Sequence, residues 1–127
     1  MPSDFENLDV YKRARELRKR VSMLIKQLPE VEKFNLTSQM RRAALSVTNN
    51  IAEGHGSQSY RHNISYLYKA RGSVYELMDD LLACKDEGYF QPEHLDDLKS
   101  DMINTVMVIN GYIRYLEAKL PDNRSRS

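Results

Sequence analysis

The chain has 127 residues, of which 41% are hydrophobic and 29% charged, a balance typical of one globular domain and unlike that of a disordered or fibrous chain. No apolar run approaches the roughly 18 residues of a membrane-spanning helix, and the polar, acidic N-terminal segment is unlike a secretory signal. We therefore expect a cytoplasmic protein that does not associate with membranes.

The net charge of +1 conceals a strong asymmetry along the chain. Residues 10–75 contain 13 Lys or Arg and four acidic residues, whereas residues 76–127 contain six Lys or Arg and eleven acidic residues. Such a polarised molecule either offers one face to an anionic partner or pairs its two halves within or between subunits.

The first predicted helix extends from Val10 to Leu28, and Pro29 stops it because proline lacks the amide hydrogen that a helix interior needs. Apolar residues recur in this segment at alternating spacings of four and three, which places them on one face of a helix. In the link from Pro29 to Asn35 we expect Phe34 to pack against a helix end. The apolar face consists of Val10, Ala14, Leu17, Val21, Leu24 and Leu28.

The second predicted helix runs from Leu36 to Glu53, with Asn35 as its N-cap and with Gly54 and Gly56 ending it. The same spacing identifies its inward side. The residues on that side are Leu36, Met40, Ala43, Ala44, Val47 and Ile51.

The third predicted helix begins after a cap at Ser57 or Ser59 and ends at Gly88. The fourth begins at Gln91-Pro92, with proline in the first turn, and continues to Pro121. The inward positions are Ile64, Leu67, Arg71, Val74, Met78 and Leu81 in the third helix, and Leu95, Leu98, Met102, Val106, Ile109, Ile113, Leu116 and Leu120 in the fourth.

Four amphipathic helices joined by short links predict an all-α fold, an antiparallel up-down-up-down four-helix bundle. No segment shows the alternation of apolar and polar residues that is typical of a strand. We expect one bundle domain over residues 1–121 and a flexible C-terminal tail over residues 122–127.

A polar stripe lies beside the apolar face of the second helix, within about 80° on a helical wheel. An ordinary bundle helix would expose this stripe to solvent. The alternative, which we expect, is that the stripe is partly buried, with Arg42 and Glu53 paired to groups on the third helix. Gly72 in mid-helix suggests a close approach to Ala43 and Ala44. Whether the stripe is buried within a subunit or between subunits stays open. Its members are Gln39, Arg42, Ser46, Asn50 and Glu53, with Arg71, Ser73 and Glu76 as partners on the third helix.

Three stretches of the sequence resemble a known family. The run from Leu36 to Val47 (LTSQMRRAALSV), the run from Asn50 to Gly54 (NIAEG) and the run from Tyr66 to Leu77 (YLYKARGSVYEL) are similar to the four-helix-bundle proteins encoded within intervening sequences of bacterial 23S ribosomal RNA genes. The resemblance implies an antiparallel bundle and commonly a homopentamer. It also implies a relationship to accessory proteins of diversity-generating retroelements, which are thought to bind nucleic acid and a reverse transcriptase. No enzyme activity is established for the family.

The sequence offers no catalytic, metal-binding or cofactor-binding motif. His55, His62 and His94 are too dispersed for a local metal site, and the single cysteine, Cys84, excludes both an intrachain disulfide and a cysteine-based zinc site within one chain. We expect Cys84 to be buried. Ser46 on the second helix has no histidine within helical reach, and the acidic residues of the third and fourth helices are expected to be solvated. These acidic residues are Asp79, Asp80, Asp96, Asp97 and Asp101.

The first predicted helix contains seven basic residues and a single acidic one, Glu16. Lys12, Lys19 and Lys26 recur every seven residues and form one strip, a pattern that suits the phosphates of a nucleic acid. The alternative, left open, is a solvated face that pairs with the acidic fourth helix of the same or a neighbouring subunit. The candidate nucleic-acid-binding residues are Lys12, Arg15, Arg18, Lys19 and Lys26, extended across the bundle by Arg41 and Arg61.

Five tyrosines invite a comparison with base-stacking proteins. We expect most of them to lie in the core or in an interface, and leave only Tyr60 open as a stacking residue. The five are Tyr60, Tyr66, Tyr68, Tyr75 and Tyr112.

The leading hypothesis is an oligomeric, non-enzymatic protein that binds RNA or DNA through the first helix, as a ribonucleoprotein or retroelement-type accessory factor. A ring of subunits multiplies weak contacts by avidity. The alternative is a protein–protein interaction scaffold that binds no nucleic acid.

Overall fold

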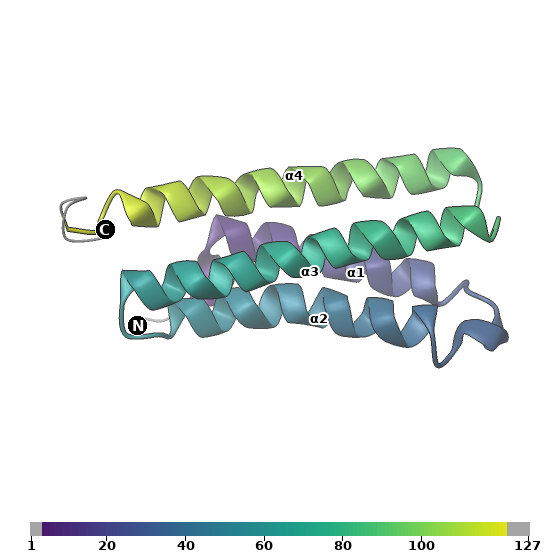
Figure 1. Ribbon diagram of the computed structural model, residues 1–127, viewed down its shortest axis with the longest axis horizontal. Helices are drawn as coiled ribbons and strands as arrows, with labels where there is room; N and C mark the ends of the chain where they lie inside the picture. Colours follow the sequence, from purple (N-terminus) through teal and green to yellow (C-terminus); the bar gives the residue numbers. More distant parts are fainter. Residues whose placement is uncertain (1–3, 122–127) are drawn as a thin grey trace.

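A computed structural model describes residues 4–121, all of whose regular structure is helical (Figure 1). The flexible tail predicted for residues 122–127 lies outside the described residues. In chain order the elements are η1 (Phe5–Asn7), α1 (Asp9–Ile25), η2 (Glu30–Glu32), α2 (Leu36–His55), α3 (Tyr60–Asp86) and α4 (Pro92–Glu117).

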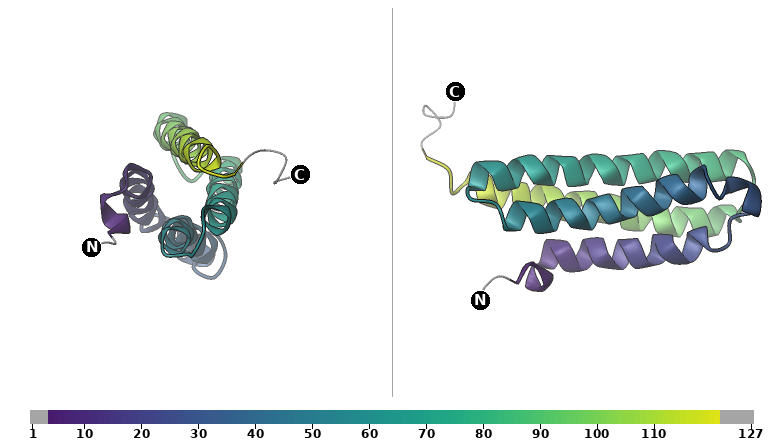
Figure 2. Two further views of the ribbon diagram at one scale, coloured as in Figure 1. Left: turned by 90° about the vertical axis from the view of Figure 1, so that its left-hand side faces the viewer. Right: turned by 90° about the horizontal axis from the view of Figure 1, so that it is seen from below.

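The four long helices lie side by side, and the chain reverses direction from each to the next (Figures 1 and 2). Helix α1 packs against α2 and α4, and α3 packs against the same two helices. Within residues 4–121, α1 and α3 make no contact and therefore lie diagonally opposite each other. The predicted all-α four-helix bundle is confirmed, with neighbouring helices antiparallel.

The core is built from the predicted apolar faces. Leu17, Met40, Leu67 and Met102, one from each helix, are almost completely buried. Burying one such side chain contributes about 1.5–3 kcal/mol, so all four helices are held by the same core. Cys84 is also buried, as predicted, and burial together with the nearby carboxylates of Asp80 and Glu32 raises the pKa of its thiol to about 11.

Two of the predicted helix ends have the expected capping geometry. Ser59 precedes α3, and its side chain accepts a hydrogen bond from the backbone N–H of His62. Gly88 follows α3 with φ of 70°, a left-handed conformation that glycine adopts without strain. The backbone N–H of Tyr89 then donates to the carbonyl of Cys84, and that of Gly88 to Lys85, which together form a Schellman motif.

Other predictions about the helix ends were wrong. Helix α1 ends at Ile25, and the turns that precede Pro29 already leave the helix before Leu28. Phe34 does not pack on a helix end but is 85% exposed, with the ammonium of Lys33 5.5 Å from its ring centroid. Asn35 precedes α2 as expected but makes no side-chain capping bond.

The close approach assigned to Gly72 was also wrong. Gly72 lies on the exposed side of α3, and a Cβ added there would meet nothing within 4 Å. The close approach occurs instead at Gly54, inside the last turns of α2. A Cβ added to Gly54 would lie 2.6 Å from Asn63 Oδ1 and 3.0 Å from the Cβ of Tyr66, both on α3.

Candidate nucleic-acid interface

The basic residues of α1 divide between two sides of the helix. Arg13 and Arg20 face α4: their Nη1 atoms each lie 3.0 Å from a carboxylate oxygen of Asp101, and Arg20 Nη2 lies 2.7 Å from Asp97 Oδ2. For these two arginines, pairing with the acidic fourth helix occurs within one chain. Asp101 is only 8% exposed, so the prediction that it is solvated was wrong, because two arginines from the adjacent helix cover it.

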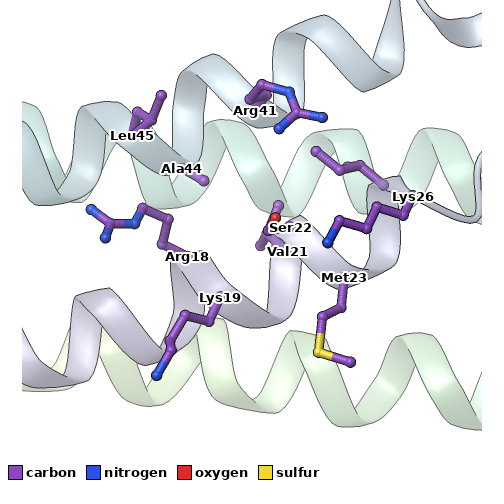
Figure 3. A pocket seen from close by; sticks show the side chains of 10 residues that line it. Arg18, Lys19, Val21, Ser22, Met23, Lys26, Arg41, Ala44 and Leu45 are labelled. Carbon is purple, nitrogen blue, oxygen red and sulfur yellow. The ribbon is translucent and has the colours of Figure 1, made fainter.

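Other basic residues gather on the side of α1 that adjoins α2. Arg18 and Lys19 of α1, Lys26 directly after α1 and Arg41 of α2 line a cavity of about 450 Å³ between the two helices, here called the α1–α2 groove. Figure 3 shows Arg18, Lys26 and Arg41 reaching toward this space, whereas Lys19 stands at its edge and points away from α2. The apolar lining residues are Val21, Met23, Ile25, Ala44 and Leu45.

The positive charge of the α1–α2 groove is not neutralised by its lining, which includes no acidic residue. Arg18 is positioned by α2, because its Nη1 donates a 2.9 Å hydrogen bond to the hydroxyl of Thr48. Lys19 has a carboxylate oxygen of Glu16 3.3 Å away, an exposed pair that stabilises little. Within residues 4–121, Lys26 and Arg41 make no ion pair.

The remaining candidate residues are placed differently. Lys12 and Arg15 are exposed on α1 and lie toward its N-terminal end from the groove. Arg61 does not extend the strip, because it stands at the start of α3, which has no contact with α1. It borders two cavities at the end of the bundle where α2 turns into α3.

The polar stripe of α2 is joined to α3 through its small side chains. The hydroxyls of Ser46 and Ser73 are 2.8 Å apart, and Asn50 donates to both the hydroxyl and the backbone carbonyl of Ser46. Arg71 turns the other way, donating to Asn110 of α4 at 2.7 Å and stacking on the ring of Tyr68.

The longer side chains of the stripe are not buried within one chain. Gln39, Arg42 and Glu53 of α2 and Glu76 of α3 are all exposed, so the expected buried pairing of the charged groups with α3 was wrong. The serine pair holds α2 and α3 close together and leaves the longer side chains at the rim of this contact. A role of the stripe between subunits stays a prediction.

The tyrosines also lie nearer the surface than a core assignment requires. Tyr60, Tyr68 and Tyr75 are 47%, 45% and 56% exposed, whereas Tyr66 and Tyr112 are half-buried.

Sequence reasoning missed the buried polar groups of α3. Asp80 was expected to be solvated but is 5% exposed, and its Oδ2 has no hydrogen-bond partner. Burial, together with the negative charges of Glu76 and Asp79, raises the pKa of Asp80 to about 6, and the positive charge of Arg42 opposes them. The sequence held one signal for the burial of Asp80. Asp80 follows Ser73, a predicted contact of α2, by seven residues and so lies on the same side of α3.

No group of three metal-ligating side chains comes together within residues 4–121. No helix in this part of the chain has the length and apolar character needed to cross a bilayer.

The fold and the site together define the class of protein: an all-helical bundle with an exposed basic groove. The chain belongs to the 23S rRNA-intervening sequence protein family, whose model matches residues 6–111. The resemblance noted in the three sequence stretches is thereby confirmed.

A solved structure supports the same fold. It is a crystal structure from Bacteroides thetaiotaomicron, described as a protein with unknown function from the S23 ribosomal protein family. The similarity has a TM-score of 0.76 and 24% sequence identity, and it covers 82% of this chain and 97% of that chain. No curated protein sequence matches the chain significantly.

Proposed function

We propose that this protein is an oligomeric, non-enzymatic nucleic-acid-binding protein whose α1–α2 groove contacts the phosphate backbone of RNA or DNA. The observation that carries the proposal is the gathering of Arg18, Lys19, Lys26 and Arg41 around a groove without a lining acid. On the other side of α1, Arg13 and Arg20 pair with Asp97 and Asp101 of α4. A cytoplasmic accessory role beside a reverse transcriptase follows from the family resemblance alone.

The dimensions of the basic strip suit a nucleic-acid backbone. Residues seven apart on a helix are separated by about 10 Å, so Lys12, Lys19 and Lys26 span about 21 Å. That length corresponds to about six base steps of a duplex. The exposed apolar groups of Met23 and Leu45, 65% and 44% exposed, widen the contact beyond charge alone.

Charge reversal of the groove is expected to abolish most of the binding. Lys19→Glu combined with Lys26→Glu removes two phosphate contacts, so the slope of log affinity against log salt should become shallower by about two. Fluorescence anisotropy with a labelled duplex of about 20 base pairs measures the affinity. Repeating it between about 50 and 200 mM salt, where phosphate contacts weaken strongly, gives the slope.

The matched control is Lys85→Glu combined with Lys99→Glu, which changes the net charge equally on exposed positions of α3 and α4. This control should keep most of the affinity. Equal losses in the two double variants would mean that only net charge matters, and absence of binding by the unaltered protein at low salt would end the proposal.

An exposed apolar strip on the other side of the bundle supports assembly into oligomers. This α3–α4 strip combines three residues spaced seven apart on α3 with two residues of α4. All five are between 44% and 63% exposed. Isolated exposed apolar residues are common, whereas five of them on two adjacent helices suit a protein contact. The family resemblance implies five copies. The strip consists of Tyr68, Tyr75, Leu82, Ile103 and Met107.

Met107→Glu is expected to dissociate the oligomer, because a carboxylate in an apolar contact loses its hydration without gaining a partner. Light scattering after size-exclusion chromatography, with and without nuclease, measures the mass of the assembly and any bound nucleic acid. Met23→Glu is the control, since Met23 is 65% exposed and Met107 63%. A monomeric unaltered protein would refute assembly. An intact oligomer that binds no nucleic acid would favour the second candidate, a protein-interaction scaffold built on the α3–α4 strip.

A further inference from the structure

A second cavity lies at the end of the bundle where α2 turns into α3 and where α4 ends (Figures 1 and 2). Its volume is about 890 Å³, within the range of small-molecule sites, roughly 300–1,000 Å³. The residues that matter here come from the first turn of α3 and from the last turns of α4 and the residues after it. They are Tyr60, Arg61, Asn63, Tyr112, Tyr115 and Lys119, and the space that they line is called the end cavity.

The end cavity has aromatic faces. The rings of Tyr112 and Tyr115 are stacked, with centroids 5.9 Å apart and planes at 12°. Tyr115 is 56% exposed and Tyr60 47%, so flat aromatic surface is available to a ligand. A planar heteroaromatic ring gains about 1–3 kcal/mol by stacking on such a side chain.

Asn63 lines the cavity, but its Oδ1 is not open to a ligand. The residue is 7% exposed, and its Oδ1 is buried against Gly54 of α2, where an added Cβ would lie 2.6 Å away. Its amide interacts with the hydroxyl of Tyr112, so Asn63 helps to hold Tyr112 in place beside Tyr115.

Positive charges border the cavity. The ammonium of Lys119 lies 4.8 Å from the ring centroid of Tyr115, and Arg61 makes no ion pair among the described residues. Leu8, four residues before Lys12, also lines the cavity, so the basic strip of α1 begins next to it. A strand that follows the strip therefore has the end cavity within reach.

We propose that the end cavity binds an unpaired nucleotide, with the base stacked beside Tyr112 and Tyr115 and the phosphate at Arg61 and Lys119. The inference rests on the proposed function in one respect: the α1–α2 groove holds the backbone of the same nucleic acid. The nucleotide comes either from a single strand or from free solution. Both sources share the chemistry of a base with its phosphate.

The test compares three probes on the full chain at low salt by fluorescence anisotropy. The first is a labelled single-stranded oligonucleotide, the second is the same strand with its bases removed at every internal position, and the third is the corresponding duplex. The unaltered protein is expected to prefer the normal strand to the abasic strand on the order of tenfold. Tyr115→Ala should abolish this preference, because the normal strand loses the stacking surface that the abasic strand does not use.

Tyr75→Ala is the matched control, because Tyr75 is also 56% exposed but lies on the α3–α4 strip. It should keep the ratio of normal to abasic affinity, even if a weaker assembly lowers both. Lys19→Glu with Lys26→Glu should lower the affinity for all three probes and keep the ratio. Binding of adenosine monophosphate, measured by equilibrium dialysis and lost in Tyr115→Ala, identifies free nucleotide as a ligand in its own right.

The possible failures are distinguishable. A ratio near one in the unaltered protein, without binding of adenosine monophosphate, overturns the end-cavity proposal even if the duplex binds. A ratio that falls equally in Tyr115→Ala and Tyr75→Ala also overturns it. Binding of adenosine monophosphate that Tyr115→Ala abolishes, in a protein that ignores the duplex, supports the cavity and refutes the groove.

Discussion

Replacing Gly54 by alanine is expected to destabilise the bundle by about 2 kcal/mol. The new Cβ would lie 2.6 Å from Asn63 Oδ1, 3.0 Å from the Cβ of Tyr66 and 3.2 Å from the backbone carbonyl oxygen of Asn63. The last two contacts cannot be relieved by rotating a flexible side chain, so α2 and α3 must separate. Alanine's better helix propensity, worth about 1 kcal/mol, offsets only part of that cost. Urea denaturation followed by circular dichroism measures the free energy of unfolding.

Gly72→Ala is the control for this effect. Gly72 lies inside α3, and a Cβ there would meet nothing within 4 Å. The same substitution should therefore stabilise the protein by about 0.5–1 kcal/mol through helix propensity. If the two variants change stability in the same direction, the close approach at Gly54 is not what holds α2 against α3.

Asp80→Asn is expected to stabilise the protein at neutral pH by about 1–3 kcal/mol. Burial and the charges of Glu76 and Asp79 together raise the pKa of Asp80 to about 6. In the unfolded chain this carboxyl group has its ordinary pKa near 3.8, so folding at intermediate pH takes up a proton. The unaltered protein thus loses this part of its stability as the pH rises from about 4 through about 6. Asparagine stays neutral and does not lose it.

The measurement is the difference in unfolding free energy between Asp80→Asn and the unaltered protein from pH 4 to pH 8, a window set roughly by the two pKa values. Taking a difference cancels the titration of the other groups, which is common to both proteins. The difference should be smallest near the acid end and largest above pH 7. The control Asp79→Asn removes an exposed charge from the neighbouring position and should change stability much less. Parallel curves for the unaltered protein and Asp80→Asn would show that Asp80 is ionised in the folded state at no cost.

Most of the candidate interface could be predicted from the sequence, and the exceptions have a common physical reason. Arg18, Lys19 and Lys26 share one helix, and their relative positions follow from helical geometry alone. Arg61 was assigned to the same surface, but only the order of helices around the bundle decides that α3 lies diagonally opposite α1. The hydrogen bond from Arg18 to Thr48 likewise depends on the register of α1 against α2.

What the sequence by itself determined is the set of four amphipathic helices and their core faces, because the spacing of apolar residues along a helix is a local property. The family also followed from contiguous stretches of residues. Only the tertiary structure decided which polar and small residues lie at helix contacts: Asp80 and Asp101 are buried, Arg42 and Glu53 are exposed, and the close approach falls at Gly54. These residues lie on the flanks of their helices, where burial depends on the rotation and register of the adjacent helix rather than on the residue's own position in the chain.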